Sequence, residues 1–208
     1  LGVFVDCPFA VTFDVGYTKL NELRITLDKQ DFELYQISGE SYDEIIHEFR
    51  KMIGMSYIPP LWSFGYGQCR WSYMTEDEVR AVADGCDKNN IPVDMIYLDI
   101  DYMDKYKDFT VDSKTFGGFD SLVADMKAKG IHLVPIIDGG VKVEEGYDVY
   151  EEGRDNGYFC KDENGEDYLV AVWPGLCCFP DMLNDEARAW FGNKYKVLTD
   201  KGIDGFWN

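Results

Sequence analysis

Acidic and aromatic side chains follow four of the strands that the sequence predicts, at the point where each strand ends. These endings are Gln68-Cys69-Arg70-Trp71, Asp99-Ile100-Asp101-Tyr102, Ile136-Ile137-Asp138 and Trp207-Asn208. In parallel α/β architectures, functional residues gather at the carboxyl ends of the strands. We therefore expect three carboxylates, two tryptophans and an arginine to meet at one rim. Tryptophan rings pack on the apolar C–H face of a sugar, so this rim suits a polyhydroxylated ligand.

Asp99 and Asp101 are two residues apart, so on an extended backbone both would point to the same face. In one interpretation they accept hydrogen bonds from sugar hydroxyls, and in the other they are loop carboxylates that cap the next turn. Because Asp99 closes an apolar run, we favour the binding role for Asp99, whereas Asp101 fits both roles equally. Asp-x-Asp also binds metal in many nucleotide-sugar glycosyltransferases, but the motif alone is weak. An EF-hand does not fit, because Asp104 stands where Gly is needed and Thr110 where Glu is needed.

The composition argues against several classes of partner. The chain of 208 residues has 39 acidic and 20 basic residues, for a formal net charge of −19. Such a surface repels phosphate backbones and anionic lipid headgroups, so we expect neither nucleic-acid nor membrane partners. Neither GxGxxG nor GxxxxGK[ST] occurs, which argues against a nucleotide-phosphate site. The high aromatic share of 15% suits core packing or a sugar-binding cleft.

The histidines and cysteines give little support to metal or redox chemistry. His47 falls in an expected helix and His132 in an expected strand, and we interpret both as structural. No cysteine pair has CxxC spacing, and Cys177 and Cys178 are adjacent, so we predict free, buried thiols in a reducing, cytoplasmic compartment. No apolar run reaches the roughly 20 residues of a membrane helix. The first residues lack the basic start of a signal peptide and look like a strand within a longer protein.

The first part of the chain predicts the edge of an all-β module, followed by one helix. The strand-like runs are Leu1–Val5, Ala10–Val15, Leu23–Leu27 and Phe32–Ile37. Ser41 and Glu44 are three apart and form a capping box, and the apolar residues after them, up to Ile53, fall on one helical face.

From Leu61 onward the pattern alternates between strands and helices. The expected strands are Trp62–Cys69, Met95–Ile100, Ile131–Ile137 and Ile203–Trp207, and the expected helices are Thr75–Asn90, Phe119–Lys129 and Asn184–Lys201. Repeated strand–helix–strand units imply parallel strands, as in doubly wound sheets or eight-stranded barrels. Four strands cannot close a barrel, so in the barrel interpretation this segment is about half of one. A long insertion at about 139–182 carries Trp173, which is either a core anchor or a wall of the pocket.

Seven short motifs occur along the chain in an order that resembles glycoside hydrolase family 31. They are Pro59-Pro60-Leu61-Trp62-Ser63, Gln68-Cys69-Arg70-Trp71, Leu98-Asp99-Ile100-Asp101-Tyr102-Met103, Asp108-Phe109-Thr110, Val172-Trp173-Pro174-Gly175, Phe179-Pro180-Asp181 and Gly205-Phe206-Trp207. The resemblance covers nearly the whole chain. It implies an α/β fold in which residues 1–55 are the end of an N-terminal β-sandwich with a linking helix. Residues 56–208 would then be the first half of a catalytic (β/α)8 TIM barrel.

The resemblance also implies roles for individual residues. Asp99 is similar to the aspartate that binds hydroxyls of the non-reducing-end glucose, and Ile100 is similar to its apolar neighbour. Trp71 matches an aromatic residue that borders the pocket. The residues that line the subsite for the cleaved sugar are matched by Ile136, Trp173 and Trp207. Asp138 matches an aspartate at the end of the third strand, although Gly139-Gly140 follows it where many members have proline.

For the parent protein, the resemblance implies a retaining, exo-acting α-glucosidase that removes terminal α-linked glucose from oligosaccharides of the maltose or isomaltose type. A carboxylate attacks the anomeric carbon, a protonated carboxyl releases the leaving group, and water frees the covalent intermediate. The family motif continues from Trp207-Asn208 into the nucleophile, so no catalytic residue is expected within these 208 residues. No metal or organic cofactor is needed.

Three alternatives stay open. A non-catalytic relative would keep the sugar pocket and lack a catalytic carboxylate. A metal-dependent glycosyltransferase would use Asp99 and Asp101 as metal ligands. An α-xylosidase is the alternative within the family, although the Asp-Ile-Asp form better suits a ligand with a C6 hydroxymethyl group.

Overall fold

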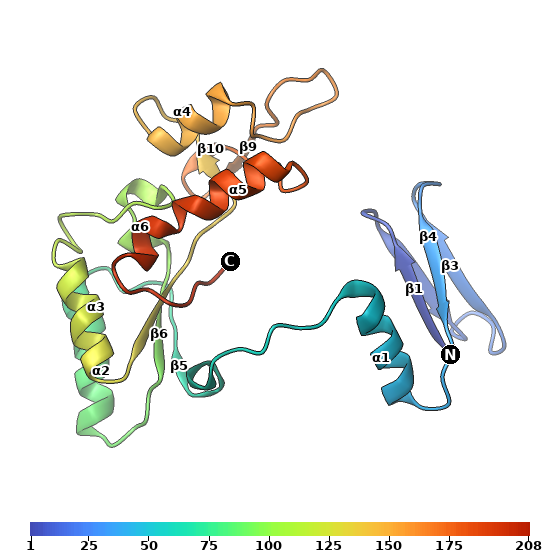
Figure 1. The fold of residues 1–208 in the computed structure, drawn as a ribbon, viewed down its shortest axis with the longest axis horizontal. Coiled ribbons are helices and arrows are strands. Elements are labelled where there is room, and N and C mark those ends of the chain that lie inside the picture. Colours follow the sequence, from blue (N-terminus) through green and yellow to red (C-terminus); the bar gives the residue numbers. More distant parts are fainter. The chain divides into compact units, whose positions relative to one another are not determined.

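The chain divides into two units, Leu1–Ile58 and Pro59–Asn208. The computed structural model describes all residues from 1 to 208 (Figure 1). None of the helices combines the length and the apolar character that a membrane span requires.

The first unit consists of two antiparallel strand pairs and one helix. Its elements are β1 (Gly2–Asp6), β2 (Val11–Val15), β3 (Leu23–Leu27), β4 (Glu33–Ile37) and α1 (Tyr42–Ile53). β1 pairs with β4, and β2 pairs with β3. The four expected strands are confirmed to within one residue at each end. The Phe4 ring of β1 lies with its centroid 5.1 Å from that of Phe49 in α1 and 5.9 Å from that of Tyr35 in β4, so α1 packs on this pair.

The predicted capping box at Ser41 is formed, and a similar cap stands at Thr75. At the start of α1, Ser41 Oγ accepts the N–H of Glu44 at 3.2 Å, and the Glu44 carboxylate accepts the N–H of Glu40 at 2.7 Å. The same use of a hydroxyl recurs at the start of the next helix, where Thr75 Oγ1 accepts the N–H of Glu78 at 3.3 Å. These bonds satisfy amide groups that have no partner within the first turn of a helix, which fixes where each helix begins.

The second unit contains the remaining elements. Its helices are α2 (Glu76–Lys88), α3 (Phe119–Ala128), α4 (Asp148–Asp155), α5 (Asp185–Lys194) and α6 (Lys196–Thr199). Its strands are β5 (Gly67–Gln68), β6 (Met95–Leu98), β7 (His132–Pro135), β8 (Val141–Lys142), β9 (Val170–Val172) and β10 (Gly175–Cys178). Three short 3₁₀ turns cover Leu61–Phe64, Ile100–Tyr102 and Asp104–Tyr106.

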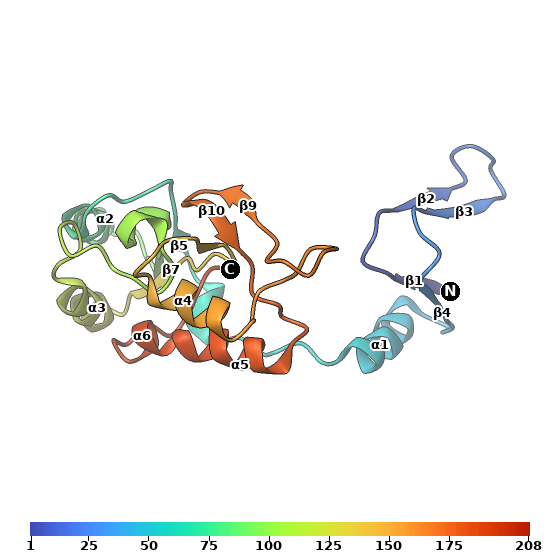
Figure 2. The same ribbon diagram turned by 90° about the horizontal axis from the view of Figure 1, so that it is seen from above.

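A parallel sheet of order β5-β6-β7 forms the centre of this unit, as the alternating pattern predicts. Met95 lies opposite both Gly67 and His132, so the three strands run in register. The C-terminal segment returns to the sheet (Figure 2), where Ile136 and Trp207 form a parallel bridge next to β7. A separate antiparallel sheet, β8-β10-β9, lies within residues 139–182.

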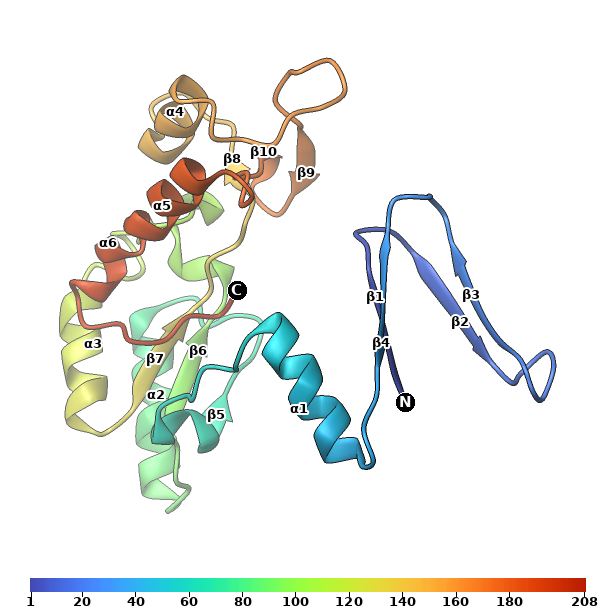
Figure 3. The ribbon, with the colours of Figure 1, turned by 45° about the vertical axis from the view of Figure 1, so that its right-hand side comes forward.

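Helices α2 and α3 lie side by side on one flank of the parallel strands (Figure 3). Their inward faces are fully buried at Val79 and Ala83 of α2 and at Leu122 and Met126 of α3. Burial of these apolar faces against the sheet is the main force that holds the layer together. Gly130, with a φ of +73°, ends α3 in the left-handed conformation that glycine adopts most readily.

The expected strand over Trp62–Cys69 is largely wrong, because only Gly67–Gln68 pair as a strand. Local hydrogen bonds favour a turn instead. The carbonyl of Pro60 accepts both the N–H of Ser63, at 3.0 Å, and the Ser63 hydroxyl, at 2.7 Å. The strands expected over 95–100 and 131–137 are also shorter, ending at Leu98 and Pro135.

Two further expectations near the C-terminus need correction. The helix expected over Asn184–Lys201 is divided at Tyr195, whose φ and ψ of −56° and −21° nevertheless remain helical. The expected strand over Ile203–Trp207 is not formed beyond the single bridge at Trp207. This segment therefore reaches the sheet only at its last residues.

One carboxyl group, Asp108, is buried in the core of this unit with 1% of its surface exposed. Its Oδ1 accepts the N–H of Asp138 at 3.0 Å, and its backbone carbonyl accepts the hydroxyl of Tyr147 at 2.8 Å. Burial raises the pKa of Asp108 to about 8, since desolvation and the charge of Asp138 outweigh the opposing effect of the Asp138 N–H bond.

We predict opposite effects of alanine at two helical glycines. In α4, a Cβ on Gly153 would overlap Cζ of the buried Phe159 ring. In α2, a Cβ on Gly85 meets nothing within 4 Å. Gly153→Ala should therefore destabilise by about 1–3 kcal/mol, and Gly85→Ala should stabilise by about 0.5–1 kcal/mol. The midpoint of thermal unfolding measures both, and equal shifts would contradict the packing around Phe159.

The buried carboxyl predicts a pH-dependent stability. The pKa of Asp108 is raised in the folded state, so the folded chain keeps this proton at a pH where the unfolded chain has lost it. Wild-type stability should therefore fall, relative to Asp108→Asn, by up to about 1.4 kcal/mol per pH unit between roughly pH 4 and 8. Denaturant unfolding across this range, with the exposed Asp87→Asn as control, measures the difference. A difference that stays constant with pH would show that Asp108 is ionised throughout.

Candidate functional site

Six of the seven residues that the sequence singled out line one pocket of about 260 Å³ in the second unit. They are Trp71, Asp99, Ile100, Ile136, Trp173 and Trp207. The seventh, Asp138, lies elsewhere. A volume near the lower end of small-molecule sites, about 300 Å³, suits a compact ligand.

The parallel sheet explains why residues so far apart in sequence meet. Trp71 follows β5, Asp99 and Ile100 follow β6, and Ile136 follows β7. Because the strands are parallel and in register, their carboxyl ends lie at the same edge. Trp207 is held at this edge by a backbone hydrogen bond, in which its carbonyl accepts the N–H of Ile137 at 2.9 Å.

Trp173 comes from a different source, the loop between β9 and β10 in the insertion. Both Trp173 and Trp71 leave most of their surface open to solvent, with 71% and 78% exposed. Ile100 and Ile136 are instead buried at 8% and 7% exposure. The pocket thus combines a buried aliphatic base with open tryptophan walls.

Asp99 is the carboxylate of this pocket, and a hydrogen bond within the chain orients it. Its Oδ1 accepts the N–H of Ile100 at 2.8 Å and so caps the 3₁₀ turn Ile100–Tyr102. This arrangement leaves Oδ2 to accept hydrogen bonds from a ligand.

The same turn corrects the expectation that Asp99 and Asp101 share a face. The backbone is no longer extended after Asp99, so alternation of side chains no longer applies. Asp101 lines a different hollow, together with Tyr106 and Lys142.

Asp138 follows β7 but lines a separate hollow with Tyr195 and Asn208. Burial raises the pKa of Asp138, and the negative charge of Asp99 raises it further. Asp138 is therefore close enough to influence the pocket electrostatically without lining it.

Arg70 does not join the rim as expected. Its guanidinium lies over the ring of Tyr73, 5.7 Å from the ring centroid, which is a favourable position for a cation beside an aromatic face. The pocket therefore has the three tryptophans that the sequence singled out, but only one of the three carboxylates expected at the rim and no arginine.

Two residues that support the pocket were missed in the sequence. The buried hydroxyl of Tyr102 donates to the carbonyl of Ile136 at 2.8 Å, and the Asp108 carboxyl holds the N–H of Asp138. Together they fix the backbone at the end of β7. The motif Asp108-Phe109-Thr110 is the only signal that could have drawn attention to Asp108.

The contacts of His132 agree with the structural role that we predicted for it. His132 Nδ1 lies 2.9 Å from a carboxylate oxygen of Asp204, and its ring stacks on Trp62 with centroids 4.1 Å apart, so its role is structural. All six cysteines are free, as predicted, but only Cys177 and Cys178 are buried, and Cys69 is exposed. Residues 1–208 contain no cluster of three or more His, Cys, Asp or Glu side chains with the arrangement of a metal site.

Comparison with known proteins places this chain in a family. Residues 56–208 match the family description "Glycosyl hydrolases family 31 TIM-barrel domain". The chain is 41% identical over 207 residues to alpha-glucosidase 2 of Bacillus thermoamyloliquefaciens, covering 100% of this chain and 26% of that protein. The chain thus spans about a quarter of the length of the curated relatives it matches.

Solved structures agree with this match. A family 31 alpha-glucosidase from Bacteroides thetaiotaomicron has a TM-score of 0.87 at 31% identity, over 99% of this chain and 35% of that one. A Flavobacterium johnsoniae family 31 dextranase complexed with glucose has a TM-score of 0.90 at 26% identity, over 99% and 25% of the two chains. The chain belongs to glycoside hydrolase family 31, with the TIM-barrel domain of that family over residues 56–208.

Proposed function

We propose that the protein containing this chain is a retaining, exo-acting α-glucosidase, and that the pocket beside Asp99 holds the terminal glucose of its substrate. The observation that carries the proposal is the pocket itself, in which three tryptophans surround one oriented carboxylate. Relatives at 41% and 31% identity bear the name alpha-glucosidase. The dextranase that resembles this fold was solved with glucose, which supports a glucose-sized site.

The pocket offers an apolar surface for the C–H face of a glucose ring and a hydrogen-bond acceptor for its hydroxyl groups. The C–H face packs on an indole ring of Trp71 or Trp173, where apolar contact replaces water. Hydroxyl groups donate to the free oxygen of Asp99. Ile100 and Ile136 form a dry base that strengthens these hydrogen bonds.

In this proposal the pocket recognises the sugar, and a separate pair of carboxyl groups performs the reaction. A retaining mechanism places those two groups about 5–5.5 Å apart, one as nucleophile and the other as acid and then base. The contact with Asp99 strengthens as the ring flattens toward the oxocarbenium ion, so it stabilises the transition state more than the ground state.

We also propose that residues 1–55 are the end of a β-sandwich with its linking helix, and that residues 56–208 are the first half of a (β/α)8 barrel with an insertion at about 139–182. The antiparallel pairs β1–β4 and β2–β3 support the first assignment. The parallel order β5-β6-β7, continued by the bridge at Trp207, supports the second.

A metal-dependent glycosyltransferase fits this geometry less well. Such an enzyme needs Asp99 and Asp101 as ligands of one metal ion, yet the 3₁₀ turn between them directs the two carboxylates to different hollows. A chelator that leaves the activity of the intact protein unchanged would exclude it.

The first test uses the intact protein with maltose, isomaltose and a β-linked disaccharide, and follows the released glucose by proton NMR. We expect glucose to appear first as the α-anomer, from α-linked sugars alone, because two inversions retain the configuration. The relative rates on maltose and isomaltose then give the linkage preference. Initial release of the β-anomer would contradict retention, and saturable binding without turnover would indicate a non-catalytic sugar-binding relative.

The second test removes the charge of Asp99. Asp99→Asn keeps an oxygen that can cap the turn, but it loses the charged acceptor for the sugar hydroxyl. We expect kcat/KM for the preferred disaccharide to fall roughly 10- to 100-fold, with little change in thermal stability.

The matched control for this variant is Asp162→Asn. Asp162 also accepts backbone N–H groups, from Asn164 at 2.8 Å and Glu166 at 3.0 Å, but it lies outside the pocket. If both variants lower kcat/KM equally, the role assigned to Asp99 is wrong.

A further inference from the structure

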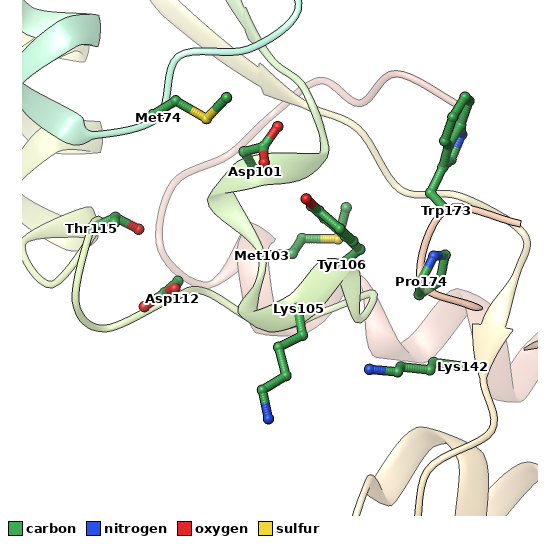
Figure 4. Close-up of a pocket in the computed structure, with 10 residues that line it drawn as sticks. All are labelled: Met74, Asp101, Met103, Lys105, Tyr106, Asp112, Thr115, Lys142, Trp173 and Pro174. Atoms are coloured by element: carbon green, nitrogen blue, oxygen red, sulfur yellow. The ribbon is translucent and has the colours of Figure 1, made fainter. Parts of the chain in front are cut away.

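Packing around its own side chain does not hold Trp173 at the wall of the pocket, because 71% of its surface is exposed. Its position depends instead on the turn between β9 and β10, and on the contacts that hold the insertion at 139–182 against the rest of the unit. Figure 4 shows Trp173 and Lys142 of the insertion on one side of a hollow, with Tyr106 of the loop after β6 across from them.

The turn that carries Trp173 is fixed to β8 by the antiparallel sheet of the insertion. β10 pairs with β9 on one side and with β8 on the other. The N–H of Val143 donates to the carbonyl of Leu176 at 2.8 Å, which extends the pairing one residue beyond β8. The next residue is Glu144, so a contact that holds Glu144 also holds Trp173 through a short, hydrogen-bonded stretch of backbone.

Glu144 is paired with two lysines, one of which lies outside the insertion. Its Oε2 lies 2.7 Å from Nζ of Lys142, and its Oε1 lies 3.1 Å from Nζ of Lys107. Lys107 also lies 2.9 Å from Oδ2 of Asp104, and only 12% of its side chain is exposed. Hydrogen bonds from Lys142 and Lys107 lower the pKa of Glu144 to about 2, so the carboxylate is charged at neutral pH.

A second contact joins the same loop to the insertion. Nζ of Lys107 lies over the ring of Tyr147, 5.6 Å from its centroid. Tyr147 is buried, and its hydroxyl donates to the carbonyl of Asp108 at 2.8 Å. The neighbours Lys107 and Asp108 therefore hold the insertion at two points, Glu144 and Tyr147.

The loop that carries Lys107 runs from Asp104 to Thr110 and is itself firmly held. Thr110 Oγ1 accepts the N–H of Asp104 at 3.0 Å and donates to the carbonyl of Lys107 at 2.6 Å. Tyr106 and Phe109 each have a φ of +62°, in the left-handed region that residues other than glycine seldom adopt. Such conformations persist where surrounding contacts enforce them. The loop is thus a fixed base against which the insertion can be placed.

We propose that Lys107 is a positioning residue that, through Glu144, holds the insertion against the Asp104–Thr110 loop and so keeps Trp173 at the wall of the pocket. The proposal rests on the proposed glucose-binding role of that pocket and adds to it a residue that does not line it. A buried ion pair adds little net stability over apolar residues of the same size. It does fix how two surfaces meet, because a shift would separate both charges from their partners.

The test uses the intact protein with 5-fluorotryptophan in place of tryptophan, and identifies the fluorine signal of Trp173 by its loss in Trp173→Phe. Lys107→Met keeps most of the side-chain volume and removes the charge, and Glu144→Gln makes the matching change from the insertion. The control is Lys194→Met. Lys194 has 16% of its side chain exposed and lies 2.8 Å from the Glu152 carboxylate, so it also ties the insertion down, but through α4 and α5.

Without sugar, we expect Lys107→Met and Glu144→Gln to shift or broaden the Trp173 signal, because the ring loses its fixed place. Lys194→Met should leave this signal unchanged. A Trp173 signal that stays unchanged in Lys107→Met and Glu144→Gln would overturn the proposal, and so would an equal change in all three variants.

The affinity for glucose measures the consequence for the pocket. We expect the Kd for glucose to rise about 3- to 10-fold in Lys107→Met, the size of one weakened aromatic contact, and less than about twofold in Lys194→Met. In a Trp173→Ala background, Lys107→Met should add less than about twofold, because the ring through which it acts is gone. Equal losses with and without Trp173 would overturn the proposal. If the wild type binds no glucose, the proposed function fails, and the fluorine signal still decides whether Lys107 positions Trp173.

Discussion

The parallel, in-register pairing of β5, β6 and β7 is the constraint on which the rest of the second unit depends. It aligns the carboxyl ends of the three strands at one edge, and the chain returns there a fourth time at Trp207. Residues more than a hundred positions apart thereby line one pocket. Such an edge can surround a ligand with aromatic and acidic groups from several directions, which no single helix or hairpin can do.

Buried polar contacts hold the segments that follow the aligned strands. Asp99 ends β6 by capping its own 3₁₀ turn, which separates its carboxylate from that of Asp101. Tyr102 and Asp108, from the segment that follows, hold the backbone of Ile136 and Asp138 at the end of β7. The pocket beside Asp99 and the neighbouring hollow thus share the support of one turn and two buried hydrogen bonds.

Much of this structure could be predicted from the sequence, and the failures have physical causes. The capping box at Ser41 located helix α1 because that bond is local. The strand expected to begin at Trp62 is a turn, because the N–H and the hydroxyl of Ser63 donate to the carbonyl of Pro60 within the same segment. Six pocket residues could be named because strand ends and family motifs mark them. Asp108 could not be assigned a role from the sequence. Its role depends on its burial and on a hydrogen bond from the N–H of Asp138, which is thirty residues away.

The most direct measurement is a crystal structure of the intact protein with glucose. We expect one glucose in the pocket, with its C–H face on a tryptophan of the set Trp71, Trp173 and Trp207, and its hydroxyls within hydrogen-bond distance of Asp99. Such a complex would establish that the edge of the parallel sheet is a glucose-binding site. A pocket that stays empty at saturating glucose, or a sugar bound without contact to Asp99, would contradict the central claim.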